Sequence, residues 1–473
     1  MFQYFLYNLL RRKWFFIAIA LMFLIAGAHP TENLSSQALA VIGIIVMAII
    51  LFITSVVPLP ATALLIAFFQ VFFKINRPEQ VARSFAGDSM FFIMGVLLIS
   101  NIMISQKIDR RLSSLLIGFT GFNLRRLLIG IIIICAILAA LIGQHTAAAL
   151  LFPVVMALIA GLDEEKEIKN KTAKILLFAL TYSSMIGAMA TPSGGGRNPL
   201  MIEYLWRIAG IKVSYFQWMI LAVPISIALI PVIYFSLRIA FPVKSKTIQI
   251  KEDYKARLSF RQGDKKLNNK LLATIGIFGL LLFLWLFFSA KYGMGIIALF
   301  GVLLYLILGI ADWNEIARKT NWGVILIYAS SLSLGLAMQQ TGVTVAFADW
   351  IINTSYKLHL DSTPIILSTI CFISSTMSNV LSHGPSVAIT GPIFLRLADI
   401  MHLNVLVIGI ATALSGSFGY LTVISAPSNS LIHATGYVNT KDFFKAGIIC
   451  LLLSIVVIVV FILFYWNLLG FEL

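Results

Sequence analysis

Two apolar stretches of this chain are interrupted by small and polar residues at a depth where a membrane-spanning helix should remain apolar. The first interruption, Gly143 to Thr146, lies between apolar residues 127–142 and 147–160, and the second, Ser378 to Ser386, follows about 240 residues later. Lipid cannot satisfy the backbone groups that a broken helix frees, so each interruption must face protein or a water-filled cavity. Paired interruptions in the two halves of a membrane chain are typical of a transporter's substrate site.

The composition predicts a polytopic membrane protein. Of 473 residues, 60% are hydrophobic and 11% are charged, whereas soluble domains average about half apolar and a quarter charged residues. Windows such as residues 271–290 and 447–465 are long enough to cross a hydrocarbon core of about 30 Å. The three cysteines, Cys135, Cys371 and Cys450, lie in apolar runs without metal or redox spacing, which is typical of buried free thiols.

The formal charge of +16 does not indicate a nucleic-acid partner, because the positive residues gather in a few short loops between apolar spans. This distribution follows the positive-inside rule for a protein of the cell membrane, with the N-terminus in the cytoplasm and the C-terminus outside. Residues 244–270 carry nine Lys or Arg against three acids and are predicted to form a cytoplasmic linker between two halves.

The two halves repeat each other. Three pairs of matching residues have nearly constant spacing: Arg83 and Arg318 (235), Pro153 and Pro392 (239), and Pro192 and Pro427 (235). Such spacing predicts an internal duplication. An odd number of crossings before residue 271 makes the second copy run the other way, so the repeats are expected to be inverted.

Each repeat is predicted to hold a re-entrant hairpin and a discontinuous helix. Residues 127–142 and 147–160 are short for two full crossings, which favours a hairpin. The predicted fold is an all-α polytopic membrane protein with inverted repeats, two re-entrant hairpins and two discontinuous helices. Its expected parts are the lead and first span (1–37), repeat 1 (38–240, hairpin about 125–160, broken helix about 175–208), the linker (241–270), and repeat 2 (271–473, hairpin about 362–398, broken helix about 405–435).

The four polar interruptions, at residues 143–146, 191–198, 378–386 and 425–430, are expected to converge at one depth. Helix N-termini favour carboxylate, phosphate or sulfate, and unwound carbonyls favour a small cation. The glycines 194–196 lack the Gly-Lys-Ser/Thr ending of a nucleotide loop. The sequence has no evident catalytic triad, carboxylate pair or metal-ligand cluster, so an enzyme is not predicted.

Arg197 is the most informative single charge. An arginine here either snorkels to an interface or pairs with a carboxylate, or it faces a bound anion. Acids are nearly absent from the predicted membrane segments, and three glycines precede Arg197, so we favour the anion-facing role. His145 and His383 occupy matching positions in the two hairpins. Each is either a neutral hydrogen-bonding group or a site of proton coupling.

These motifs resemble the divalent anion:sodium symporter family, the INDY-type carriers of citrate and dicarboxylates. Thr191-Pro192 with Asn198, and Ala426-Pro427-Ser428-Asn429, match the family's motif in the broken helices, and Thr435-Gly436-Tyr437 matches the segment that follows. The resemblance implies a homodimer with a fixed scaffold and a mobile transport domain that moves by an elevator mechanism.

The hairpin tips depart from the family's Ser-Asn-Thr pattern. Counting back from the hairpin prolines places Gly143-Gln144-His145 and Ser382-His383-Gly384 at the tips, whereas an alternative register places Ser378-Asn379-Val380 at the second tip. The resemblance assigns tip oxygens to carboxylate and sodium, and the first tip lacks those side-chain oxygens. Arg197 and the two histidines are candidates to supply the missing charge.

The sequence thus predicts a secondary carrier of a small divalent anion, with a dicarboxylate favoured and with proton, counter-anion or sodium coupling. Alternatives are an inorganic oxyanion carrier or ion exchanger, and a membrane receptor that binds without transport. Expected partners are the anion and membrane lipid, with no cofactor beyond a coupling sodium ion or proton. The predicted substrate residues are Gln144, His145, Thr146, Thr191, Arg197, Asn198, Ser382, His383, Gly384, Pro427 and Asn429. The predicted coupling residues are His145 and His383 for protons, and Ser378, Asn379 and Ser425 for sodium.

Overall fold

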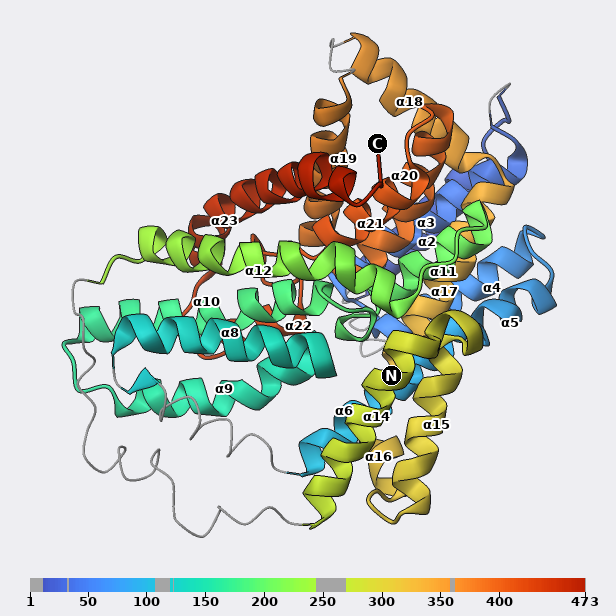
Figure 1. The fold of residues 1–473 in the computed structure, drawn as a ribbon. Helices are drawn as coiled ribbons and strands as arrows, with labels where there is room; N and C mark the ends of the chain where they lie inside the picture. The colour runs from blue at the N-terminus through green and yellow to red at the C-terminus, as the bar shows by residue number, and fades with distance from the viewer. Residues whose placement is uncertain are drawn as a thin grey trace, which may run out of the picture.

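The protein is helical throughout the residues that its computed structural model describes, which are 12–31, 34–106, 120–121, 123–243, 269–357 and 362–472 (Figure 1). The helices of the first half are α2 (Lys13–Ala26), α3 (Ser36–Thr54), α4 (Leu59–Phe72), α5 (Pro78–Phe85), α6 (Asp88–Ser105), α8 (Leu124–Ile142), α9 (Gln144–Gly161), α10 (Lys166–Met189), the short turn η1 (Pro192–Gly194), α11 (Arg197–Ala209) and α12 (Tyr215–Ala240).

The second half is helical as well. Its helices are α14 (Asn269–Tyr292), α15 (Met294–Ile307), α16 (Trp313–Lys319), α17 (Trp322–Gln340), α18 (Val343–Lys357), α19 (Thr363–Leu381), α20 (His383–Ile400), α21 (Val405–Ser415), α22 (Pro427–His433), α23 (Thr440–Val460) and the π-helical turn η3 (Phe461–Trp466). Most of the expected linker, residues 244–268, and residues 1–11 of the lead lie outside the described residues.

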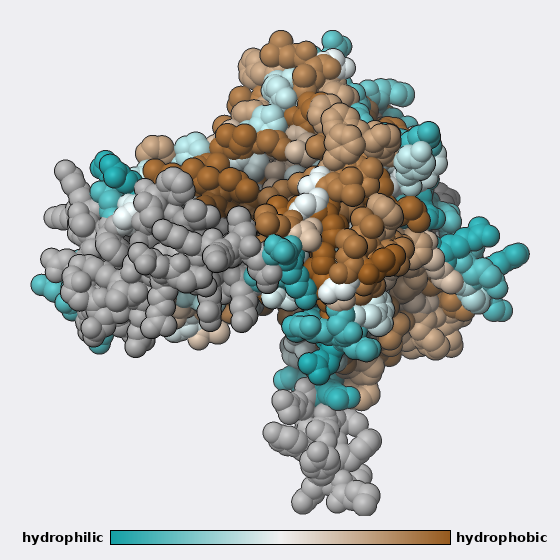
Figure 2. Space-filling view, turned by 60° about the horizontal axis from the view of Figure 1, so that its bottom comes forward, coloured by the Kyte–Doolittle hydropathy of each residue, from teal (hydrophilic) through white to brown (hydrophobic). Residues whose placement is uncertain are grey.

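The outer surface of the protein suits contact with lipid. Ten helical segments of the described chain are long and apolar enough to cross a membrane. Large apolar side chains such as Phe68, Ile239 and Phe287 are exposed on the outer faces of α4, α12 and α14. Figure 2 shows extensive apolar surface on the face that it presents. Apolar area on this scale needs a lipid or protein partner, as expected for a multi-pass membrane protein.

Local sequence signals explain where several of these helices begin. The side chains of Ser35, Ser214 and Asn404 accept hydrogen bonds from backbone N–H groups in the first turns of α3, α12 and α21. Asn439 and Asp442 form a reciprocal capping box at the start of α23. Such caps stabilise a helix end by about 1 kcal/mol, so they help to fix the boundaries of apolar helices whose interiors carry little positional information.

Helices α4 and α15 end with the same backbone hydrogen bonds. After α4, the amides of Ile75 and Asn76 both donate to the carbonyl of Gln70. After α15, the amides of Ile310 and Ala311 donate in the same way to the carbonyl of Tyr305, 235 residues later. Two helices with the same ending at this spacing are a structural counterpart of the spacing seen between Arg83 and Arg318.

The two hairpins, α8–α9 and α19–α20, turn at single residues. Gly143 (φ 91°) and Ser382 (φ 76°) join the paired helices, and both lie in the left-handed region. That conformation favours glycine, which explains Gly143, whereas Ser382 adopts it in spite of its Cβ. Residue 382 is thus the second tip, which excludes the alternative register at Ser378-Asn379-Val380. The hairpins approach the centre of the molecule from different sides (Figure 1).

The first broken helix begins earlier than the charge pattern indicates. Residues 166–174, which precede the predicted broken helix (about 175–208), form the first turns of α10. Lys and Glu are good helix formers, and an ion pair joins Lys171 to Glu167 one turn before it. The charge therefore marks the part of the helix outside the apolar layer rather than a loop.

The second broken helix ends earlier than expected. The sequence predicts an apolar helix that continues to Ile424, but α21 ends at Ser415 and the chain remains unwound until α22 begins at Pro427. The reason is tertiary: the Asn379 side chain donates to the carbonyl of Phe418 and accepts from the amide of Leu421. These bonds replace helical ones, and periodicity does not reveal them.

Candidate functional site

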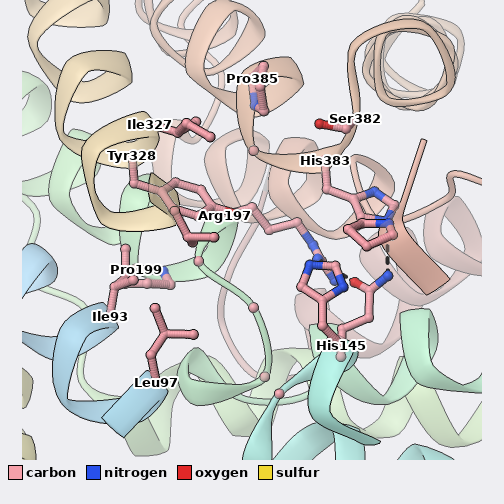
Figure 3. A pocket seen from close by; sticks show the side chains of 18 of the residues that line it. Ile93, Leu97, His145, Arg197, Pro199, Ile327, Tyr328, Ser382, His383 and Pro385 are labelled. Carbon is pink, nitrogen blue, oxygen red and sulfur yellow. Dashed lines mark hydrogen bonds between the residues drawn. The ribbon is translucent and has the colours of Figure 1, made fainter. Parts of the chain in front are cut away.

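A cavity of about 450 Å3 lies where the two hairpin tips and the two breaks meet. All four polar interruptions contribute lining residues, and so do α6 and α17 (Figure 3). Helices α9, α11 and α20 each begin at this cavity, and no side chain caps their first amides. Uncapped helix N-termini present free N–H groups and a positive dipole end, which together favour an anion.

The guanidinium of Arg197 occupies the centre of this arrangement. The side chain is 2% exposed and comes from the first turn of α11. Its Nε donates to Ser417 Oγ at 2.7 Å, Nη1 donates to Gln144 Oε1 at 3.1 Å, and Nη2 donates to the Met185 carbonyl at 3.4 Å. All three acceptors are neutral, and none of the ion pairs among the described residues involves Arg197.

The buried acids of the described chain already have other partners. Glu203 pairs with Arg207 at 2.6 Å, and Asp442 pairs with Lys174 at 2.8 Å. The half-buried Asp88 accepts from two backbone amides at the start of α15. A buried charge without a counter-charge is costly. Arg197 therefore has the properties expected of a group that binds an anion from solution.

The two hairpin tips are joined by a hydrogen bond between Gln144 Nε2 and His383 Nε2 at 3.2 Å. Arg197 can only donate, so the amide oxygen of Gln144 faces Arg197 and its NH2 group faces His383. His383 Nδ1 lies 3.0 Å from the carbonyl of Gly416, which can only accept, and 2.7 Å from Ser378 Oγ. The pattern assigns a neutral His383 with its hydrogen on Nδ1.

His145 differs from His383. Its ring lies at the cavity beside Arg197 (Figure 3), its side chain is exposed, and it makes no hydrogen bond with the described residues. Both of its ring nitrogens are thus available to a ligand or a proton. The two histidines are therefore not equivalent. Counted back from the hairpin prolines, His383 matches Gln144, and His145 matches Gly384.

The structure separates the predicted substrate residues into two groups. Those that line the cavity are Gln144, His145, Thr146, Arg197, Ser382, His383, Gly384 and Pro427. Thr191, Asn198 and Asn429 do not line it. Thr191 Oγ1 donates to the carbonyl of Ala140 and accepts from the amide of Gly194, so it joins the first break to the first hairpin.

Asn198 and Asn429 hold the two breaks open in the same way. Asn198 Nδ2 donates to the carbonyls of Ala188 and Thr191, and Asn429 Nδ2 donates to those of Gly419 and Thr422. All three pairs of matching residues are 231 apart. Pro192 begins η1 and Pro427 begins α22, so these two prolines, at a spacing of 235, do not occupy matching positions. The residues that match between the two breaks are the asparagines.

The oxygens proposed for sodium are largely engaged. Ser378 Oγ donates to the Gly416 carbonyl, Asn379 Oδ1 accepts from the Leu421 amide, and Ser425 Oγ donates to the Gly419 carbonyl. Only Ser425 lines the cavity. The buried Oδ1 atoms of Asn198 and Asn429 have no hydrogen-bond partner in the described chain. No group of three His, Cys, Asp or Glu among the described residues is placed to hold a metal ion.

Tyr328 is a cavity residue that sequence reasoning missed. A Cβ on Gly196 would lie 2.3 Å from Tyr328 Cε2, and a Cβ on Gly384 would lie 2.8 Å from its Cε1. The ring therefore fits between the first break and the second hairpin tip because both contact residues are glycines. Tyr328 lies within the apolar run of α17, where periodicity gives no sign of this contact.

Helix breaks, convergent helix N-termini and a buried guanidinium that pairs with no acid among the described residues are features of the substrate site of a membrane transporter. The family model "Sodium:sulfate symporter transmembrane region" matches residues 10–471, so the chain belongs to this family of secondary transporters and is not an enzyme.

Named proteins similar to the chain include transporters of two bacteria. An "Uncharacterized transporter" of Haemophilus influenzae is 23% identical over 470 residues, which cover 96% of both chains. The "Sodium-dependent dicarboxylate transporter SdcS" of Staphylococcus saprophyticus is 25% identical over 458 residues, which cover 92% of this chain and 87% of that protein. The crystal structure of the YdaH transporter of Alcanivorax borkumensis has a similar fold, with a TM-score of 0.53 and 12% identity over 82% of this chain and 88% of that one.

Proposed function

We propose that the protein transports a small dicarboxylate across the cell membrane. The observation that carries this proposal is the buried guanidinium of Arg197, which has only neutral partners and lies at a cavity that three helix N-termini face. A carboxylate would complete the hydrogen bonding of this guanidinium and supply the missing charge. His145 and the tip amides are placed to assist the same anion.

Cavity size and lining favour a dicarboxylate over sulfate. The volume of about 450 Å3 leaves room for a carbon skeleton between two charged groups. A tetrahedral oxyanion would fill little of it and would leave apolar surface without a partner. A sulfate-like substrate nevertheless remains the second candidate, because the description of the family model names sulfate. SdcS, by contrast, is named for dicarboxylates.

We further propose an elevator movement in a homodimer. The hairpins and the broken helices would form the moving body, because they carry the polar site residues. Helices α12 and α23 would move with them, because α12 packs against α10 and α23 packs against α12 and α19. The remaining helices, α2–α6 and α14–α18, would form the scaffold. The N-terminus would be cytoplasmic and the C-terminus outside, in accord with the charge distribution of the loops.

For coupling, we propose a counter-anion or a proton, with His145 as the proton-carrying group. His145 has free ring nitrogens beside the cavity, whereas both nitrogens of His383 are engaged. Protonation of His145 beside Arg197 becomes favourable only when a bound anion offsets the added positive charge. Sodium is the alternative, supported by the unpartnered Oδ1 atoms of Asn198 and Asn429 and by the name of SdcS.

Reconstituted vesicles test these proposals. Vesicles preloaded with succinate should take up labelled succinate by counterflow, while a sulfate preload should give little. Sodium and pH gradients are then varied separately. Uptake that follows a sodium gradient at constant pH and does not respond to a pH gradient would support sodium coupling. It would exclude His145 as the proton-carrying group. Saturable binding without any flux would indicate a receptor.

A further inference from the structure

The cavity is divided into a polar side and an apolar side. Figure 3 shows the guanidinium end of Arg197 grouped with His145 and His383, with Ile93, Leu97 and Ile327 apart from them. The polar side is built by the hairpin tips and the first break, and the apolar side by α6 and α17. A ligand that fills both sides must carry charge at one part of its body and apolar surface at another.

The apolar side offers few hydrogen-bonding groups to a ligand. Val96, Leu97, Val324 and Ile327 are aliphatic. Ser100, the polar residue of α6 at the cavity, already donates to the carbonyls of Val96 and Ile142.

Two other hydroxyls lie near this side. Ser55 Oγ lies 3.4 Å from the carbonyl of Phe52, as a donor. The Tyr328 ring packs at Gly384, where a Cβ would lie 2.8 Å from Cε1 and 2.9 Å from the hydroxyl oxygen. A ligand hydroxyl placed against the aliphatic side chains of this wall would therefore exchange water for contacts that are mostly with carbon.

This wall has a direct consequence for selectivity. A hydroxyl that is buried without a hydrogen bond costs free energy, whereas a methyl group buried against aliphatic side chains contributes favourably. Two substrates of equal size and charge, one with a hydroxyl and one with a methyl at the same carbon, should thus bind unequally. The difference reports on the α6 and α17 wall and not on the anion-binding groups.

We propose that the substrate is an anion whose carbon skeleton carries alkyl or other apolar groups in place of hydroxyls. Its carboxylate binds at Arg197, and its apolar body lies against Ile93, Leu97 and Ile327. This inference rests on the proposed anion transport and narrows its substrate class. Hydroxylated dicarboxylates are poor substrates because their hydroxyl faces the aliphatic wall.

The test compares malate with methylsuccinate, which carry a hydroxyl and a methyl group on the same four-carbon dicarboxylate. Each compound competes with labelled succinate in counterflow into vesicles that contain the full-length protein. We expect half-inhibition at a roughly tenfold lower concentration of methylsuccinate, within the range that one group in an apolar pocket provides. Equal inhibition, or stronger inhibition by malate, overturns the proposal. Absence of succinate counterflow would instead contradict the proposed function itself.

A pair of variants assigns the preference to the wall. Ile327→Thr replaces a methyl-bearing branch at the cavity with a hydroxyl and should reduce the preference for methylsuccinate several-fold, measured as the ratio of the two half-inhibiting concentrations. Ile325→Thr makes the same change on α17 at a residue that does not line the cavity, and it should leave the preference unchanged. If both variants change the preference equally, the effect is not local to the wall and the proposal fails.

Discussion

At the level of single residues, substitution of Arg197 should weaken anion binding without lowering the stability of the protein. Arg197→Gln removes the positive charge at the cavity and should weaken anion binding by at least about 100-fold, as expected when two charge-assisted hydrogen bonds are lost. The unfolding midpoint of the anion-free protein should stay the same or rise, because an uncompensated buried charge is removed. Binding is measured by isothermal titration with succinate, and stability by thermal unfolding.

Arg207 provides the matched control for this prediction. It lies on the same helix, α11, but forms an ion pair with the buried Glu203 and does not line the cavity. Arg207→Gln should lower the unfolding midpoint, because it leaves Glu203 without that partner, and anion binding should remain. If Arg197→Gln binds succinate normally, the anion-facing role is wrong.

Within the broken helices, close contact at Gly196 should control whether the site forms. Gly196→Ala places a methyl group within 2.3 Å of the Tyr328 ring, so one of the two must move. We expect succinate counterflow to fall at least about tenfold, as for other displacements of site groups by about 1 Å. The double variant with Tyr328→Ala should restore part of the activity, because the space is then free.

The control for this substitution is Gly276→Ala on α14. No atom lies within 4 Å of a Cβ at Gly276, and the residue is helical. The change should leave transport intact and favour the helix slightly. Loss of transport in Gly276→Ala as well would show that the assay does not distinguish the contact at Tyr328 from general disturbance.

The capping asparagines of the two breaks should be equivalent in their effect on stability. Asn198→Ala and Asn429→Ala each remove two hydrogen bonds to backbone carbonyls, and Asn429→Ala also removes the bond to Ser425 Oγ, so each should cost about 2 kcal/mol of unfolding free energy. Aspartate substitutions should not rescue, because a carboxylate cannot donate. The exposed Asn467→Ala should cost less than about 0.5 kcal/mol in the same thermal unfolding assay.

How far the sequence predicts this architecture depends on the range of the interactions involved. The start of α12 is a local property, because the Ser214 cap and the apolar run that follows it are neighbours in the sequence. The tip at Gly143 follows from a single glycine between two apolar helices. The early end of α21 and the contacts of Tyr328 depend on residues far away in the chain, and no local pattern records them.

The site shows the same division. Arg197 can be recognised from the sequence alone, because few charged residues lie in the predicted membrane segments. The different roles of His145 and His383 were not predictable, since they arise from the pairing of Gln144 with Arg197 across 53 residues. Likewise, Asn429 matches a site motif in sequence but serves to hold the break rather than to line the cavity.

For the whole molecule, an elevator movement requires that contacts between the two bodies break during each transport cycle. Ser89 of α6 donates to Glu203 of α11 at 2.7 Å, and this bond joins the proposed scaffold to the proposed moving body. Lys174 of α10 and Asp442 of α23 lie 2.8 Å apart within the moving body. The two pairs thus offer contacts for cross-linking, one between the proposed bodies and one within the moving body.

Cysteines introduced at Ser89 and Glu203, joined by a short bifunctional thiol reagent, should reduce succinate counterflow in proportion to the cross-linked fraction. Cysteines at Lys174 and Asp442, joined by the same reagent, should leave counterflow unchanged apart from any loss seen before cross-linking. The native Cys135, Cys371 and Cys450 are buried, which limits background reaction. Normal counterflow in fully cross-linked Ser89/Glu203 protein would mean that α6 and α11 do not separate, and the assignment of the two bodies would then be wrong.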